Sequence, residues 1–490
     1  MRSTLPLITA LSLLACGPGS AKRLGSDGTS GSVTVANPMP MPEPKPEPKP
    51  EPMPVPPAPI WGLVKLVDTN PAPDVVEVEL KAQETTLDVS QKVTLPMYTF
   101  NGFFPGPLLE AKAGDRVVVH FTNLLKEPTT IHWHGLRISS EMDGNPRIQN
   151  PVPAGGTFTY DFVVPEAGTF WYHPHVRSNE QIEKGMYGGI VVRAKDEPLY
   201  ENDRYLVLDD VLLDANGFVP FLTSPMEAMH GRFGNFLVIN GHLIADGFLL
   251  PADAKKNAVE RWRIVNTSNA RTMVLEIPGA TFKVIGTDGG LLQKPYTTTR
   301  LEVAVGQRFD LEVKFDQGTD ATLVSQVLTS DGKGGAVEVP IPLMKVAVGA
   351  DASTMAAPVL HPPVPQAAKM VSRVVTLDFD AINDPQMGIM WRINGKSHDH
   401  TPLFTAAKGE TVLLRLTNKV GMEHPFHLHG QFFEVPGRPL EPGLKDVVLL
   451  PGFESVDLIA TLDNPGEWMA HCHILEHSEL GMMAEFVVTP

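Results

Sequence analysis

The segment Arg116-Val117-Val118-Val119-His120-Phe121-Thr122-Asn123 decides the fold, because its apolar residues alternate and the chain repeats the pattern twice more. The repeats run from Glu260 to Asn266 and from Thr411 to Asn418. Their final asparagines are 143 and 152 residues apart (266 − 123 and 418 − 266), a period of whole domains rather than of a solenoid. Alternating apolar residues are typical of half-buried strands. The sequence therefore predicts three consecutive all-β domains.

Turn signals and composition point to β-sandwiches. An Asn-Gly pair precedes each repeat, at Asn101-Gly102, Asn240-Gly241 and Asn394-Gly395. The 46 prolines and 42 glycines indicate many turns and strands rather than helices. A net charge of −16 argues against a nucleic-acid partner, which needs a basic surface. We read this charge as a contribution to solubility.

The N-terminus carries a targeting pattern. Arg2 precedes an apolar run from Leu5 to Ala15, which is too short to span a bilayer as a permanent helix. The run ends in Leu13-Leu14-Ala15-Cys16, which resembles the bacterial lipobox. We predict a lipoprotein signal peptide at 1–15 and lipid on Cys16. A plain signal peptide with a chance cysteine is the alternative.

A proline-rich segment follows the signal peptide. Between Pro38 and Pro59 proline stands at nearly every second position, with alternating glutamate and lysine. Such a segment favours an extended polyproline tether, which reaches roughly 70 Å at about 3.1 Å per residue. We expect residues 16–59 to hold an exported protein off a membrane, in the periplasm or at the cell surface. The outer membrane is favoured by analogy, and we expect a monomer.

Ten of the sixteen histidines fall in four short clusters, and one of the two cysteines lies inside the last cluster. Neutral imidazole is the commonest metal-ligating side chain, so this density indicates metal binding. A thiolate, two imidazoles and a thioether together describe a blue-copper site. Zinc, the rival at mixed cysteine–histidine sites, has no redox role. The clusters are His132-Trp133-His134, His173-Pro174-His175, His424-Pro425-Phe426-His427-Leu428-His429, and His471-Cys472-His473 with His477 and Met482.

The position of each histidine pair follows from the domain repeat. One pair lies nine and eleven residues after the strand-ending asparagine in the first and third repeats, where the middle repeat has Leu275 and Ile277. A second pair lies five and seven residues after a glycine, and the middle repeat has none near Thr322-Leu323-Val324-Ser325. We expect domains 1 and 3 to share one metal cluster, with domain 2 as a spacer. The pairs are His132 and His134, His173 and His175, His427 and His429, and His471 and His473.

Strand geometry predicts how the two kinds of site are connected. Side chains alternate between the faces of a strand, so His471 and His473 point one way and Cys472 points the other. A metal on Cys472 is then joined through two short backbone paths to metals on both neighbouring histidines. This arrangement predicts a covalent electron route from a one-electron site to a multinuclear site.

These motifs resemble those of the multicopper oxidases, and specifically of three-domain bacterial laccases and copper-efflux oxidases. The resemblance covers roughly residues 60–490. It implies three consecutive cupredoxin-like Greek-key β-sandwich domains, which we place at 60–197, 198–352 and 366–490. It also implies four coppers, with substrate oxidation at the type 1 copper and O2 reduction to water at the other three. The implied ligands are His424, Cys472, His477 and Met482 for type 1; His132 and His427 for type 2; and His134, His173, His175, His429, His471 and His473 for the type 3 pair.

Acidic residues are expected to deliver protons to O2. Asp143, eleven residues past His132, resembles the family's acidic residue near the type 2 copper, although Asp143-Gly144 is also a common turn pair. The family often has a glutamate directly after the last copper histidine, where this chain has Ser478. Glu479, or a water held by Ser478, is the substitute we expect. Asp446 resembles a residue at the type 1 edge, with a solvated loop carboxylate as the alternative.

The electron donor is left open by the sequence. A laccase-like oxidase of phenols and small aromatics is our first hypothesis, and a cuprous oxidase for copper tolerance is the second. No methionine-rich insert lies between Asp351 and Trp391, which mildly favours the first. Complete ligation argues against a non-catalytic copper protein, and the three repeats argue against a two-domain nitrite reductase. The remaining candidates are Met226, Met229 and His230, which suit cuprous ion or packing, and the expected surface pair His398 and His400.

Overall fold

The computed structural model describes residues 62–490, apart from 196, 198, 199, 201, 279, 331–335, 352–358, 362–369 and 440. The chain divides into a unit Met1–Pro54 and a unit Val55–Pro490. The predicted signal peptide 1–15 and tether 16–59, with Cys16, lie outside the described residues and stay predictions. Among the described residues, no helix has the length and apolar composition that crossing a membrane requires.

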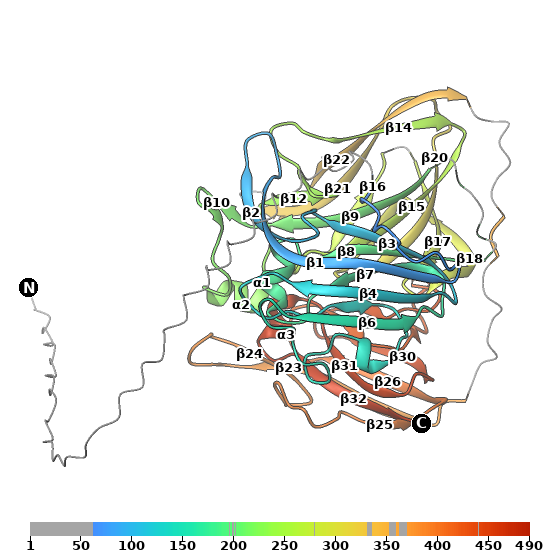
Figure 1. The fold of residues 1–490 in the computed structure, drawn as a ribbon. Coiled ribbons are helices and arrows are strands. Elements are labelled where there is room, and N and C mark those ends of the chain that lie inside the picture. Colours follow the sequence, from blue (N-terminus) through green and yellow to red (C-terminus); the bar gives the residue numbers. More distant parts are fainter. Residues whose placement is uncertain are drawn as a thin grey trace, which may run out of the picture. The chain divides into compact units, whose positions relative to one another are not determined.

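The first domain has two four-stranded sheets, ordered β2-β1-β4-β6 and β3-β8-β7-β5 (Figure 1). Strands of both sheets contribute to one buried core, which includes Val119, Trp133 and Ile190. The elements are β1 (Val75–Asp88), β2 (Thr94–Phe100), β3 (Gly106–Lys112), β4 (Arg116–Asn123), β5 (His132–His134), the 3-10 helix η1 (Ser140–Met142), β6 (Thr157–Val163), β7 (Gly168–His173), α1 (Ser178–Glu183) and β8 (Gly188–Arg193).

The second domain has a seven-stranded sheet, β13-β12-β9-β15-β20-β17-β18, and a five-stranded sheet, β14-β22-β21-β16-β19. Trp262, Leu275 and Met344 lie in its core. The elements are β9 (Asp203–Val211), β10 (Leu213–Asp214), β11 (Gly217–Phe218), α2 (Pro225–His230), β12 (Phe236–Ile239), β13 (His242–Leu243), β14 (Leu250–Lys256), β15 (Val259–Asn266), β16 (Met273–Glu276), β17 (Phe282–Thr287), β18 (Gly290–Thr298), β19 (Arg300–Val303), β20 (Arg308–Lys314), β21 (Ala321–Ser330) and β22 (Ala336–Asp351).

The third domain has two five-stranded sheets, β24-β23-β26-β30-β28 and β25-β32-β31-β27-β29. Its core includes Phe426, Trp468 and Cys472. The elements are β23 (Arg373–Ile382), β24 (Met390–Ile393), β25 (Thr405–Ala407), β26 (Glu410–Asn418), β27 (His424–Leu428), β28 (Phe433–Glu434), β29 (Val447–Leu450), β30 (Ser455–Leu462), β31 (Gly466–Cys472), α3 (Leu475–Glu479) and β32 (Met483–Thr489).

The same strand pairing recurs in all three domains. The first strand of each domain pairs in parallel with a later strand, as β1–β4, β9–β15 and β23–β26. The second sheets contain the matching parallel pairs β3–β8, β14–β22 and β25–β32. Parallel neighbours cannot be joined by a hairpin, so the chain passes through the second sheet before it returns. The predicted all-β fold of three cupredoxin-like domains is confirmed.

Each pair of sheets lies inside one of the three predicted domains. The strands β1–β8 fall within 60–197, β9–β22 within 198–352, and β23–β32 within 366–490. We therefore propose these limits as the domain boundaries.

The asparagine that ends each repeated strand forms the same hydrogen bonds in every domain. In domain 2, Asn266 Oδ1 accepts from Ser268 N at 3.0 Å, and Asn266 Nδ2 donates to the carbonyls of Arg271 at 2.7 Å and Val303 at 2.8 Å. Asn123 and Asn418 make the corresponding three bonds. One side chain thus satisfies three backbone groups at the turn after the strand, which explains why the sequence repeats it.

We predict that Asn266→Ala destabilises domain 2 without changing the metal ligands. The substitution leaves one amide and two carbonyls without their partner, which we expect to cost about 2–3 kcal/mol. Urea unfolding of the metal-free protein measures the loss. Asn216→Ala, at an exposed turn of the same domain, is the control and should change stability by less than about 0.5 kcal/mol. Equal stability of both variants would contradict the anchoring role.

Candidate metal centre

The strand register places the histidine pairs opposite each other. His132 of β5 faces His173 of β7 in domain 1, and His427 of β27 faces His471 of β31 in domain 3. The equivalent pair in domain 2 is Leu275 and Ser325. Trp133, Leu428 and Cys472, each between two of these histidines, enter the domain cores. The middle domain therefore repeats the strand positions but supplies no ligating side chain there.

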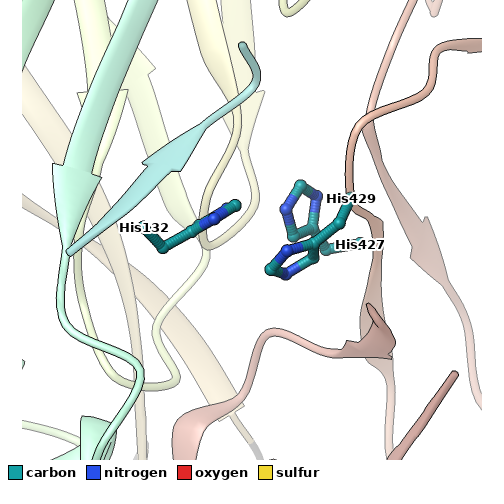
Figure 2. Close-up of side chains that lie close together, drawn as sticks. All are labelled: His132, His427 and His429. Carbon is teal, nitrogen blue, oxygen red and sulfur yellow. The ribbon is translucent and has the colours of Figure 1, made fainter. Parts of the chain in front are cut away.

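Eight buried imidazoles from domains 1 and 3 lie together. The ring of His132 stacks on that of His429 with centroids 3.9 Å apart, and His134 stacks on His427 at 3.8 Å. Figure 2 shows His132 pointing from its strand toward His427 and His429 on a different part of the chain. Three triads have ligand atoms within 4.8 Å of one another: His132-His427-His429, His132-His134-His173 and His175-His429-His471.

Five of these imidazoles are held through Nδ1. His132 Nδ1 donates to the carbonyl of Asp143 at 2.9 Å, and His429 Nδ1 donates to Asp143 Oδ2 at 2.8 Å. His173, His427 and His471 each donate from Nδ1 to a backbone carbonyl at 2.9 Å. Such outer partners fix the tautomer and leave Nε2 as the free ligand atom.

The free nitrogen atoms fit a metal cluster. Buried polar atoms normally have hydrogen-bond partners, because an unpaired one is costly. Among the described residues, these buried nitrogens of the cluster have none: Nε2 of His132 and His427, and both nitrogens of His175 and His473. His134 Nε2 also has no hydrogen-bond partner, but it lies on the side of the Asp446 carboxylate, 3.4 Å from Oδ1. Burial also lowers the pKa of His175, His427 and His473 well below its usual range, which keeps the lone pairs available. Cations that bind neutral imidazole would satisfy the unpaired nitrogens of the cluster.

A second, mononuclear group lies in the core of domain 3. Cys472 Sγ lies 3.6 Å from His424 Nδ1 and 3.8 Å from His477 Nδ1, and the two nitrogens are 3.2 Å apart. Burial raises the pKa of the Cys472 thiol, so ionisation needs a bound cation. Met482 is buried in the same core. Two imidazoles, a thiolate and a nearby thioether are the donor set of a blue-copper site.

Two of the acidic candidates, Asp143 and Asp446, are buried beside different histidines. Asp143 is buried and contacts His429, as described above. Asp446 is also buried, and its Oδ1 lies 3.4 Å from His134 Nε2. Both expectations for Asp446 are wrong: it lies beside the imidazole cluster rather than at the type 1 edge, and it is not solvated. Its carboxylate contacts His134 of domain 1 and Arg308 of domain 2, which spacing within domain 3 cannot reveal.

The residues after His477 do not reach the cluster through any described hydrogen bond. Ser478 Oγ donates to the carbonyl of Leu475, and Glu479 Oε1 accepts from Ser178 N at 2.7 Å. Burial raises the pKa of Glu479. Glu476, which the sequence did not single out, is buried and accepts from Asn269 Nδ2 at 2.8 Å and Arg232 N at 2.9 Å. It ties domain 2 to α3.

The helix α2 covers the mononuclear group. His477 Nε2 donates to the carbonyl of Met229 at 3.1 Å, and Trp391 Nε1 donates to the carbonyl of Ala228 at 2.9 Å. The Trp391 ring lies 4.1 Å from that of His477. Met226 and Met229 leave 67% and 43% of their surface exposed, so both face outward over this group. His398 and His400 are exposed, and the backbone amide of His398 donates to the carbonyl of Gly481.

Three β-sandwich domains with a cysteine–histidine group and an imidazole cluster define a copper-dependent oxidoreductase. Three family models, each described as multicopper oxidase, match residues 81–197, 223–338 and 362–490. This chain belongs to the multicopper oxidase family, whose members use O2 as acceptor and bind four coppers.

Individual relatives cover most of the chain. The chain is 28% identical to the multicopper oxidase MmcO of Mycobacterium tuberculosis, over 83% of this chain and 86% of the relative. A multicopper oxidase from Campylobacter jejuni, called a metallo-oxidase, aligns with a TM-score of 0.77 and 27% identity, over 88% and 94% of the two chains. A laccase-like CueO from Ochrobactrum sp., with activity towards lignin model compounds, gives 0.75 and 27%, over 88% and 100%.

We predict that Cys472→Ser removes one copper per chain and leaves the imidazole cluster loaded. The intense visible absorption and all turnover should disappear, because the thiolate that gives both is lost. Metal analysis and absorption spectroscopy of the copper-loaded variant measure this. Retained blue colour would show that the cysteine does not bind copper.

Proposed function

We propose that this chain oxidises a small substrate one electron at a time and reduces O2 to two waters. The ligand roles are those that the resemblance implies. The type 1 ligands are His424, Cys472, His477 and Met482; the type 2 ligands are His132 and His427; and the type 3 ligands are His134, His173, His175, His429, His471 and His473.

The placement of Cys472 between two cluster histidines supports this function best. Its side chain enters the core of domain 3 beside His424 and His477, whereas His471 and His473 face the imidazole cluster. When copper is bound, it supplies the electron transfers between the substrate and O2. The protein's part is to join both sites by a few covalent bonds and to keep bulk water away from them.

Asp143 is the acid that we propose for proton delivery. Its Oδ2 accepts from His429, while its Oδ1 lies 3.2 Å from His132 Nδ1 and has no hydrogen-bond partner among the described residues. A carboxyl group within the cluster can pass protons to the reacting oxygen. Glu479 is the weaker candidate, since its described partner is the Ser178 amide.

Two substitutions separate the proton role of Asp143 from its role in holding His429. Asp143→Asn keeps an acceptor for His429 but cannot exchange protons, so we expect full copper content and turnover reduced about 100-fold or more. Asp143→Ala also removes the acceptor, so copper retention should weaken by about 10–100-fold. Steady-state O2 uptake and metal analysis measure the two effects. Normal turnover of Asp143→Asn would contradict the proton role.

For the reducing substrate, we propose a small phenol or aromatic that docks over α2. This choice is supported by the exposed apolar side chains of Met226, Met229 and Phe233, on α2 or just after it, because the Met229 carbonyl accepts from His477. Cuprous ion is the second candidate, because the same two methionines offer soft thioether ligands. Either donor would pass its electron through the backbone of α2 or through Trp391, since His477 itself is buried.

The donors can be distinguished with the double variant Met226→Leu/Met229→Leu. Leucine keeps the apolar volume and removes the sulfur atoms. If cuprous ion is the substrate, its KM should rise about tenfold or more, equivalent to about 1.4 kcal/mol. The KM for a dimethoxyphenol should stay unchanged. Met370→Leu, at a 92% exposed methionine of domain 3, is the control. O2 uptake that occurs with the phenol but not with cuprous ion would exclude cuprous ion as the substrate.

We also propose that the enzyme is an exported lipoprotein. Leu13-Leu14-Ala15-Cys16 and the proline-rich residues 16–59 support lipid attachment and a tether to a membrane, with the outer membrane favoured. Mass spectrometry of the mature N-terminus tests for lipid on Cys16.

A further inference from the structure

Domain 2 reaches the imidazole cluster, although it supplies no ligand from the histidine positions. The turn before β20 brings Gly306 against the cluster in a left-handed conformation with φ of 84°. A Cβ atom on Gly306 would lie 3.0 Å from His473 Cδ2 and 3.2 Å from His134 Cε1. Glycine is therefore required for this close approach. The spacer role that the sequence suggested for domain 2 is incomplete.

Arg308, two residues further on, is fully buried and uses all its donors. Its Nη1 and Nη2 donate to Asp446 Oδ1 and Oδ2, both at 2.6 Å. Its remaining bonds go to three carbonyls: Nε to Thr169, Nη1 to Gly306 and Nη2 to Asp288. One guanidinium thus joins domain 1 through Thr169 and domain 3 through Asp446. This forked geometry is specific to arginine.

Asp446 in turn contacts two histidines of the cluster. Its carbonyl accepts from His427 Nδ1 at 2.9 Å, and its Oδ1 lies 3.4 Å from His134 Nε2. His134 is oriented oppositely to the five imidazoles held through Nδ1, since its Nδ1 faces His173 Nε2 at 3.4 Å. The Asp446 carboxylate therefore lies on the Nε2 side of the His134 ring, away from Nδ1, where it favours a proton on Nε2.

We propose that Arg308 is a positioning residue of the trinuclear site, which holds the Asp446 carboxylate so that His134 presents Nδ1 and His427 presents Nε2 to copper. This inference rests on the ligand roles assigned under the proposed function. Domain 2 is then a working part of the site, because its strand β20 sets the orientation of a histidine from domain 1 and one from domain 3.

A purely structural ion pair is the alternative, and the chain offers a matched control. Arg263 is also buried between domains 1 and 2, where it pairs with Asp203 and donates to Thr169 Oγ1. It contacts no carboxylate that touches a cluster histidine among the described residues. Arg263→Lys should therefore lower stability without selectively affecting copper in the trinuclear site.

The test compares copper retention at the two sites in the full-length, copper-loaded protein. Arg308→Lys keeps the charge and loses the fork. We expect the type 1 visible absorption to stay at its wild-type intensity. Trinuclear copper should be removed by a chelator at about 10–100-fold lower concentration, with loss of the near-ultraviolet band of the type 3 pair. Asp446→Asn should give the same selective loss, and it carries the test if Arg308→Lys does not fold.

The double variant Arg308→Lys/Asp446→Asn should retain as much copper as whichever single variant retains less. The reason is that the two substitutions break the same contact. Trinuclear copper retained as in the wild type by both single variants would overturn the inference and leave the proposed function standing. Equal loss in Arg263→Lys would also overturn it. A wild-type protein that binds no trinuclear copper would overturn the proposed function as well.

Discussion

The burial of eight imidazoles at the seam between domains 1 and 3 is the constraint on which the rest of the structure depends. Each buried nitrogen without a partner is costly, and several such nitrogens face one another there. Burial, together with the neighbouring rings, lowers the pKa of His427 and His429 well below its usual range, so their lone pairs are available to a cation. A cluster of cations offsets this cost. The copper ions are therefore expected to contribute to domain association as well as to redox chemistry.

The backbone holds most of this cluster in place. Carbonyl groups of Asp143, Pro174, Asp446 and Cys472 accept from histidine Nδ1 atoms, so the main chain orients these rings. Side chains complete the arrangement at two positions, Asp143 beside His429 and Asp446 beside His134. These two carboxylates contact different histidines, Asp143 beside His132 and His429 and Asp446 beside His134 and His427. Backbone support is robust to substitution, whereas the carboxylates are points at which single changes act.

The sequence predicted the domains and the histidine positions because both follow from local spacing. A strand-ending asparagine with fixed hydrogen bonds marks the same point in each domain, and an H-x-H pair must lie on one strand face. The contacts it could not predict join distant segments. Arg308 and Asp446 are 138 residues apart, and His477 and Met229 are 248 apart. The prediction that places Asp446 at the type 1 edge is wrong for this reason, since no spacing within domain 3 reveals a partner from domain 2.

Helix α2, the cap over His477, separates two properties that usually change together: the preference for an electron donor and the reduction potential of the metal. The hydrogen bond from His477 Nε2 is accepted by the backbone carbonyl of Met229, so no side-chain replacement at position 229 can delete the acceptor. The outward faces of Met226 and Met229 are free to vary while this bond persists. Homologous chains with the same cap can therefore diversify in donor preference without retuning the reduction potential of the metal beneath.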